Sequence, residues 1–172
     1  MSTLVLIRHG ECVSNQRKIL VENDKEDVLT LKGCTQAELT GKALKPFLEK
    51  RSFKLYSSTL VRAKLSAEII KNEVNSLIQV EHDERLIEKT LEESYEDVFR
   101  RFNDFVYNVI SKDNELELFL IVTHGNLIQS VIGNILEAKD CSIIEVSNCG
   151  VSIVTDRQLW ACNMILHLVE FL

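Results

Sequence analysis

The chain has 172 residues, of which 45% are hydrophobic and 27% are charged, and its formal net charge is −6. This composition suits a domain with its own hydrophobic core, and the acidic balance argues against nucleic-acid binding, which needs a basic face. No apolar run approaches the roughly 18 residues that a membrane span requires, and we find no secretory signal. We therefore expect a single cytoplasmic domain over residues 1–172, with no membrane and no nucleic-acid partner.

The first half of the chain predicts strands and helices in alternation. Residues 3–7 are apolar and β-branched, as in a buried strand, and residues 29–50 have the spacing of an amphipathic helix. Pro46 falls inside that helix and predicts a kink or a break. Residues 53–57 predict a short strand, and residues 62–74 predict the helix that follows it.

The second half of the chain continues the alternation. A third strand is expected at 76–81, and Ser94 with Asp97 three residues later resembles a capping box at the start of a long helix. Apolar residues recur along this helix at intervals of three and four, which predicts a face buried in the core. These residues are Tyr95, Val98, Phe102, Phe105, Val106 and Val109.

Residues 117–122 predict a fourth strand and residues 125–136 a helix. The tail reads as a strand, a turn near Asp156 and Arg157, and another strand that could form an antiparallel edge. Strands that alternate with helices indicate βαβ units. We therefore expect an α/β fold, a three-layer α/β/α sandwich with a mostly parallel sheet and one antiparallel strand.

Polar side chains follow three of these strands. Arg8 and His9 end the first strand, His124 and Gly125 end the fourth, and Arg62 lies near the start of the helix after the second. In open α/β sheets ligands bind beyond the carboxyl ends of the strands, so these residues are expected to converge. Two guanidinium groups and two imidazoles in one crevice suit a phosphate, and the helix after Gly125 would present free amides to it.

A histidine in such a pocket can attack phosphorus and form a phosphohistidine, which water then hydrolyses. Nearby arginines favour the neutral, nucleophilic imidazole. Gly10 would let the backbone come close to the phosphate, and Ser57 or Ser58 can cap the helix that carries Arg62. The acidic stretch 22–27 is expected to be a solvated loop.

Neither a metal nor another cofactor is expected for this chemistry. No carboxylate cluster has the spacing of a Mg²⁺ or Zn²⁺ site, and the five cysteines match no zinc-binding pattern. We interpret these cysteines as small buried hydrophobes or idle thiols. They are Cys12, Cys34, Cys141, Cys149 and Cys162.

These motifs resemble those of a known family. The string LIRHGE resembles the signature of the histidine phosphatase (phosphoglycerate mutase-like) superfamily, and Asn15 matches its RHGExxxN pattern. Four further blocks resemble family segments in the family's order: LTLKGCTQA, SSTLVRAKLSA, IVTHGNLI and SNCGVSIV. The blocks span most of the chain, so the resemblance concerns the whole fold.

The resemblance implies roles for individual residues. It makes His9 the nucleophile, and it makes Arg8, Arg62 and His124 the groups that hold the transferring phosphoryl group. Asn15 and Gly125 are implied as further phosphate-binding residues. The family's general acid follows an RLxE string, which here is ERLIE and implies Glu88. Its neighbours Glu84, Glu92 and Glu93 could substitute for it.

The chain departs from the family after Glu88. It runs almost directly from RLIEKTL to EESYEDVFRRF, without the inserted lid of the family. An open crevice admits water to a phosphoenzyme, so we expect a phosphatase acting on a phosphorylated small molecule or a phosphoprotein. The alternatives are a phosphoglycerate-mutase-type phosphoryl transferase and a catalytically silent module that binds a phosphorylated ligand. An exposed edge strand in the tail could support a homodimer, and the oligomeric state is left open.

Overall fold

The computed structural model describes residues 2–18, 24–75, 77–113 and 118–171. Six strands are present: β1 (Thr3–Arg8), β2 (Lys54–Ser58), β3 (Val80–Asp83), β4 (Leu118–Thr123), β5 (Val151–Thr155) and β6 (Gln158–Met164). The α-helices are α1 (Val13–Arg17), α2 (Leu31–Leu48), α3 (Val61–Val74), α4 (Tyr95–Asn108) and α5 (Gly125–Ile135). Short 3₁₀ turns occupy Asp24–Glu26, Glu84–Leu86, Ile110–Lys112, Cys141–Ile143 and Leu166–Phe171.

The six strands form one sheet in the order β3-β2-β4-β1-β5-β6. β3, β2, β4 and β1 are paired in parallel, whereas β5 is antiparallel to both of its neighbours. The predicted mostly parallel sheet with one antiparallel strand is confirmed. The antiparallel strand β5 is not at the edge of the sheet, however, because β6 pairs with it on the outer side. A tight turn joins the two strands, in which Asp156 and Arg157 adopt positive φ angles of 49° and 63°.

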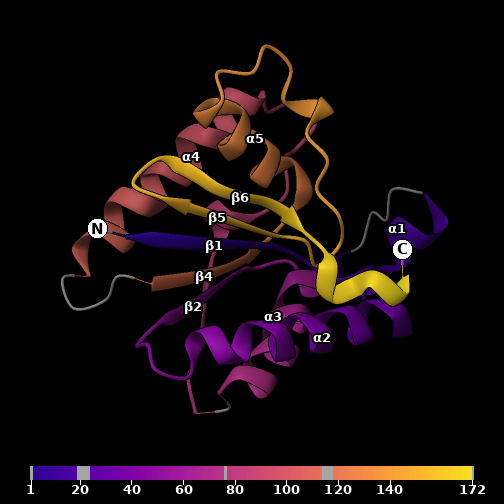
Figure 1. Cartoon of the computed structure of the whole chain (residues 1–172). Helices are drawn as coiled ribbons and strands as arrows, with labels where there is room; N and C mark the ends of the chain where they lie inside the picture. The colour runs from indigo at the N-terminus through magenta and orange to yellow at the C-terminus, as the bar shows by residue number, and fades with distance from the viewer. Residues whose placement is uncertain (1, 19–23, 76, 114–117, 172) are drawn as a thin grey trace.

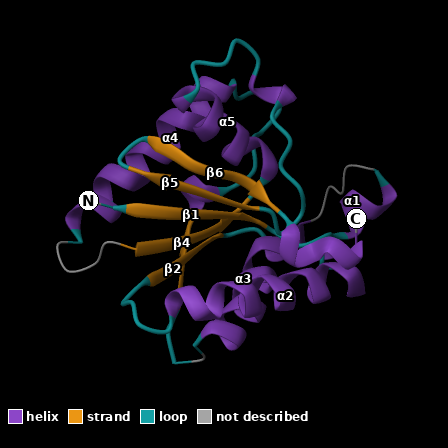
Figure 2. Cartoon of the chain, in the orientation of Figure 1, coloured by secondary structure: helices purple, strands orange, loops and turns teal. Residues whose placement is uncertain are grey.

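Helices cover both faces of the sheet, as expected for the three layers. α4 and α5 lie on one face, and α2 and α3 lie on the other (Figures 1 and 2). Strand β1 alternates between the two cores, since Leu4 and Leu6 pack with the first layer while Val5 and Ile7 pack with the second. The central strand is thus anchored from both sides.

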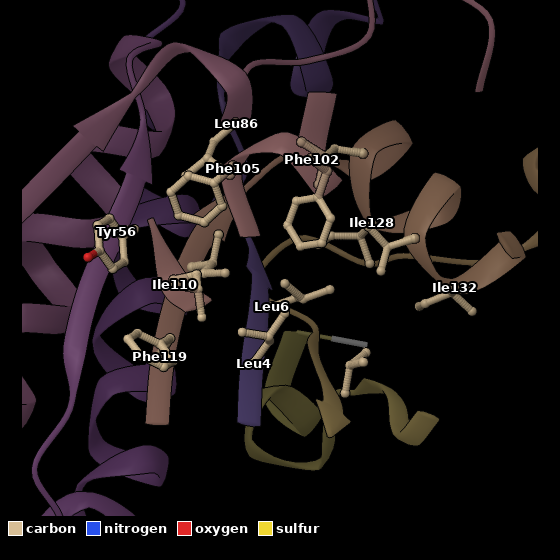
Figure 3. Packing of buried hydrophobic residues seen from close by; sticks show 14 of the residues in the cluster. Leu4, Leu6, Tyr56, Leu86, Phe102, Phe105, Ile110, Phe119, Ile128 and Ile132 are labelled. Carbon is tan, nitrogen blue, oxygen red and sulfur yellow. The ribbon is translucent and has the colours of Figure 1, made fainter. Parts of the chain in front are cut away.

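Helix α4 shows how the sequence pattern produces this packing. It begins as predicted, because the Ser94 hydroxyl accepts the Asp97 amide and the Asp97 carboxylate accepts the Ser94 amide. Phe102 and Phe105 lie 2% and 0% exposed, and the Phe105 ring meets the Tyr56 ring edge-on at 5.3 Å (Figure 3). The predicted core face is confirmed from Val98 onward.

Two predictions need correction. Helix α2 continues past Pro46 to Leu48, so the predicted break does not occur there. Pro46 lacks only the amide hydrogen that would bond the Lys42 carbonyl, and two residues later the helix ends. Strand β3 begins at Val80 and not at residue 76, which lies outside the described residues. The Leu77 amide donates to the Asn75 side chain at 3.0 Å, so this segment turns before the strand begins.

Candidate active site

The two histidine–glycine junctions lie side by side at the carboxyl edge of the sheet. β1 and β4 pair in parallel with Arg8 opposite Thr123, so the next residue of each chain segment is a histidine at the same level. The His9 amide donates to the Thr123 carbonyl at 2.9 Å. The rings of His9 and His124 have centroids 5.1 Å apart and are inclined at 60°.

A cavity of about 700 Å³ opens beside His9. Its lining includes five of the residues predicted for the site: Arg8, His9, Asn15, Arg62 and Glu88. The other predicted residues adjoin it. His124 packs against His9, and a Cβ atom built on Gly125 would lie 3.5 Å from the Arg8 Nε atom. The strand ends therefore bring all seven predicted residues to one place.

His9 is held in one tautomer. Its Nδ1 atom lies 2.8 Å from the Gly10 carbonyl oxygen, which can only accept, so Nδ1 carries the hydrogen. The pKa of His9 lies well below its ordinary value, mainly because the ring is buried and also because Arg8 and Arg62 are close. The neutral ring therefore keeps a free electron pair on Nε2, as a nucleophile requires.

Arg8 and His124 each have a buried side-chain nitrogen that makes no hydrogen bond to the described part of the protein. One Arg8 terminal nitrogen donates to the Val146 carbonyl at 2.6 Å, but its Nε has no partner. His124 bonds Ser58 through Nε2, while its Nδ1 has no partner. Among the described residues, these are the two buried side-chain nitrogen or oxygen atoms without a hydrogen bond. Burial lowers the pKa of Arg8, and the charge of Glu88 opposes that effect.

Arg62 is held from behind by two carboxylates. Its Nη1 atom lies 3.1 Å from Asp27 and 3.6 Å from Asp24, and Asp27 also accepts the amide and hydroxyl of Ser14. Asp27 is only 4% exposed, so the prediction of a solvated loop over 22–27 is wrong for this residue, whereas Lys25 and Glu26 are exposed as expected. Residues 22 and 23 lie outside the described residues. An acidic run is usually solvated, but here Asp24 and Asp27 contact the partly buried Arg62 guanidinium.

The start of helix α3 also differs from the prediction. Its N-cap is Leu60, and neither predicted serine caps it. The Asp24 carboxylate instead accepts the Val61 amide at 3.1–3.2 Å, next to Arg62 on the first turn. Ser58 accepts the Leu60 amide at 3.2 Å and turns toward His124. The serine predicted as a cap thus belongs to the site.

Asn15 and Asn148 connect the nucleophile's backbone to the pocket wall. The Asn148 amide donates to the His9 carbonyl at 3.1 Å and to the Asn15 side-chain oxygen at 3.0 Å. Asn15 Oδ1 also lies 3.4 Å from the Cys12 amide that donates to it. These contacts tie helix α1 to the exit of β1 and fix where the Asn15 side chain lies.

The four candidate glutamates have different surroundings. Glu88 lines the cavity, and Glu84 and Glu92 are exposed and are not part of its lining. Glu93 is bound by Arg101 at 2.7 Å, which holds the pKa of its carboxyl below its ordinary value. Only Glu88 among these four is thus placed to exchange a proton with a molecule in the cavity.

Comparisons with known proteins agree with this geometry. Residues 4–92 and 89–162 match the profile of the histidine phosphatase superfamily (branch 1). The chain belongs to the histidine phosphatase superfamily. The two matched segments overlap at residues 89–92.

The proteins to which the chain is similar include both phosphatases and mutases. A 2,3-bisphosphoglycerate-dependent phosphoglycerate mutase of Thermoplasma acidophilum is 28% identical over 90% of this chain and 87% of its own length. A mycobacterial glucosyl-3-phosphoglycerate phosphatase has a TM-score of 0.81 at 20% identity, over 95% of this chain and 99% of that one. A phosphoserine phosphatase of Entamoeba histolytica has a TM-score of 0.78 at 21% identity, over 98% of this chain and 100% of that one.

Several pocket residues of this histidine phosphatase fold were missed by the sequence prediction. They include Asp27, Lys18, Lys89, Tyr95 and Asn126. Asn126 follows the predicted site residue Gly125 on the first turn of α5, and this position in the sequence could have indicated that Asn126 lines the pocket. Tyr95 was assigned to the core, but it is the first residue of α4, and its hydroxyl lies 2.9 Å from Asn126 at the pocket.

Gly10 has a packing role in the fold, and its predicted approach to phosphate stays a prediction. A Cβ atom there would lie 2.3 Å from the Gly33 carbonyl oxygen, and one on Gly33 would lie 1.9 Å from the Glu11 carbonyl oxygen. The two glycines therefore let the exit of β1 pack directly on the start of α2. Glu11 accepts the Thr30 hydroxyl at 2.9 Å and so joins the same contact.

A larger hollow, of about 840 Å³, lies elsewhere, between α4, α5 and the β5–β6 turn. It is lined by apolar residues such as Phe99, Val106 and Ile135, and it contains no histidine. The chemistry of the lining residues, and not the volume of the cavity, therefore identifies the active-site candidate.

No set of three or more His, Cys, Asp or Glu residues in the described ranges could hold a metal ion, and none of the described helices is suited to cross a membrane. All five cysteines are free thiols.

Proposed function

We propose that the protein is a metal-independent phosphomonoesterase that works through a phosphohistidine on a small phosphorylated metabolite or a phosphoprotein. The observation that carries this proposal is the pair of unpartnered nitrogen atoms, Arg8 Nε and His124 Nδ1, buried beside His9. Buried polar atoms are rarely left without a hydrogen-bond partner. A phosphoryl group would supply several acceptor oxygens at this point.

The proposed reaction has two steps. His9 Nε2 attacks phosphorus, the bond from phosphorus to the ester oxygen breaks, and Glu88 gives that oxygen its proton. Water then attacks the phosphohistidine with Glu88 as the base, which returns His9 and releases inorganic phosphate. Arg8, Arg62 and His124 would bind the phosphoryl oxygens throughout, so the charge that develops on them meets preorganised donors.

The remaining residues of the cavity lining indicate which leaving groups the site would favour. Lys18 and Lys89 lie on its lining, and the exposed Leu91 stands at its rim. Two lysines favour a leaving group that carries a second negative charge, such as a carboxylate. Phosphoserine, which was bound in the amoebic relative, has such a group. We keep phosphoproteins as candidates because an open rim also admits a large substrate.

The experiment that tests the proposal is phosphate release from para-nitrophenyl phosphate in the presence of EDTA. We expect activity in the wild type, none in His9→Ala, and unchanged activity in His82→Ala, whose histidine is exposed and lies outside the cavity. Activity that persists in His9→Ala would reject His9 as the nucleophile. Absence of activity in the wild type, also with phosphoserine and phosphorylated peptides, would favour a module that only binds phosphorylated ligands.

A mutase is the second candidate, because the relative at 28% identity is a phosphoglycerate mutase. The two reactions share the phosphohistidine and differ in its fate. Phosphorus NMR of 3-phosphoglycerate incubated with the protein and catalytic 2,3-bisphosphoglycerate separates them. Formation of 2-phosphoglycerate with little inorganic phosphate would assign a mutase, whereas accumulating inorganic phosphate would support the proposed hydrolase.

A further inference from the structure

Ser58 and His124 form a buried pair beneath the candidate phosphate site. Ser58 is the last residue of β2 and His124 precedes α5, and both are 0% exposed. The Ser58 hydroxyl oxygen lies 2.8 Å from His124 Nε2. It also accepts the Leu60 amide hydrogen at 3.2 Å.

These contacts decide where the hydrogen atoms lie. The Leu60 amide can only donate, so the Ser58 hydroxyl still needs an acceptor for its own hydrogen. Among the described residues, His124 Nε2 is the remaining atom bonded to that hydroxyl. Nε2 must therefore accept, and the single hydrogen of a neutral imidazole is left on Nδ1. His124 is neutral because burial, followed by the charges of His9, Arg62 and Arg8, holds its pKa well below the ordinary value.

We propose that Ser58 is a positioning residue that fixes His124 as the Nδ1–H tautomer, so that this hydrogen is donated to the transferring phosphoryl group. The inference rests on the proposed function and deepens the description of the same site. In the opposite tautomer, an electron pair on Nδ1 would face the phosphoryl oxygens and repel them. The hydroxyl of Ser58 thus selects between a donor and an acceptor at the buried edge of the site.

His9 and His124 then share one tautomer but present opposite edges. The Gly10 carbonyl takes the Nδ1 hydrogen of His9 at 2.8 Å and leaves its Nε2 electron pair for attack. The Ser58 hydroxyl occupies Nε2 of His124 and leaves its Nδ1 hydrogen for binding. With the rings only 5.1 Å apart, one acceptor and one donor residue make chemically similar side chains perform different tasks.

The test uses nitrogen NMR of the protein labelled with ¹⁵N-histidine, with the His124 signals assigned through His124→Gln. It compares the wild type with Ser58→Ala, and uses Ser57→Ala as the matched control. Ser57 is equally buried on the same strand, but its hydroxyl donates to the Ser58 carbonyl and does not contact His124. The second readout is the dissociation constant for inorganic phosphate, measured by calorimetry.

We expect a protonated Nδ1 on His124 in the wild type and in Ser57→Ala, and a mixture of tautomers or a protonated Nε2 in Ser58→Ala. Phosphate binding in Ser58→Ala should weaken by roughly 10- to 100-fold, which is the range typical when a partner that orients a metal-binding histidine is removed. Ser58→Thr, which keeps the hydroxyl, should restore the Nδ1–H tautomer.

A protonated Nε2 on His124 in the wild type would overturn the inference, and this measurement stands even if Ser58→Ala does not fold. An unchanged tautomer or unchanged phosphate affinity in a folded Ser58→Ala would also overturn it. Both readouts use the resting protein and inorganic phosphate, so they do not depend on turnover. Lack of phosphatase activity would reject the proposed function and leave the assignment of Ser58 to be decided by these measurements.

Discussion

Acidification below about pH 6.5 should destabilise the protein through His9 and His124. Both have pKa values well below the ordinary histidine value, chiefly because of burial. The charges of Arg8 and Arg62 lower the pKa of His9 further, and those of His9, Arg62 and Arg8 lower that of His124. The unfolded chain has no such surroundings, so its histidines titrate near 6.5. Below that pH the unfolded state binds more protons than the folded state. Stability is therefore complete above pH 6.5 and is lost as the pH falls.

The size of the loss follows from the depth of burial. His9 is 2% exposed and His124 is 0% exposed, so solvent does not reduce the effect. At pH 5.5 an unfolded histidine is about 90% protonated, which lowers the free energy of unfolding by about 1.4 kcal/mol for each histidine that stays neutral in the fold. The two together give about 2.8 kcal/mol. This is a large part of the 5–15 kcal/mol typical of a domain.

The measurement is urea unfolding at pH 7.5 and pH 5.5 in buffers free of phosphate, because a bound anion would stabilise the fold. The wild type is compared with the double variant His9→Gln/His124→Gln, in which glutamine stays neutral throughout. Other groups titrate alike in both proteins and cancel in the comparison. The wild type should lose about 2.8 kcal/mol more than the double variant. Equal losses would refute the reasoning that these two rings are held neutral by the fold.

Three further substitutions test the acid, the core and the loop contact. Glu88→Gln should lower the turnover of alkyl phosphates by about 10²–10⁴-fold. Turnover of para-nitrophenyl phosphate should fall much less, because the nitrophenolate leaving group needs little protonation. Equal losses for both substrates would contradict a general acid. Phe105→Ala should reduce the unfolding free energy by about 3–5 kcal/mol in urea, against at most about 0.5 kcal/mol for Tyr107→Ala, which is 72% exposed; similar values would contradict the assigned core. Gly33→Ala should destabilise by about 1–3 kcal/mol, because its Cβ would lie 1.9 Å from the Glu11 carbonyl, and an unchanged melting temperature would argue against that contact.

The layered fold could be predicted because local signals and burial agree along most of the chain. The capping box at Ser94 marks the start of α4 to the residue, and the apolar runs of β1 and β4 end at their polar junctions. The start of β3 could not be predicted in this way. Leu77 is apolar but 90% exposed, because a turn after Asn75 carries it out of the sheet. Periodicity alone does not distinguish an apolar residue of a turn from one of a strand.

The candidate site was predictable where topology determines it. Parallel strands end at one edge, so Arg8, His9 and His124 had to meet once β1 and β4 were neighbours. The same logic explains Ser58 and His124, because they lie at the ends of β2 and β4, which are parallel neighbours. The carboxylate that supports Arg62 was not predictable in this way. Asp27 reaches Arg62 over 35 positions of sequence, because the segment before α2 packs on the start of α3, and no local pattern in the sequence records this contact.

The polar groups of the candidate site differ in whether the protein supplies them with a partner. Asp24 and Asp27 pair with Arg62, whereas Arg8 Nε and His124 Nδ1 are buried and bonded by no group of the described protein. Buried polar atoms usually have a hydrogen-bond partner, so these two nitrogen atoms beside a neutral, oriented His9 fit a pocket that binds an anion. The groups without a protein partner are the ones that phosphoryl transfer would use.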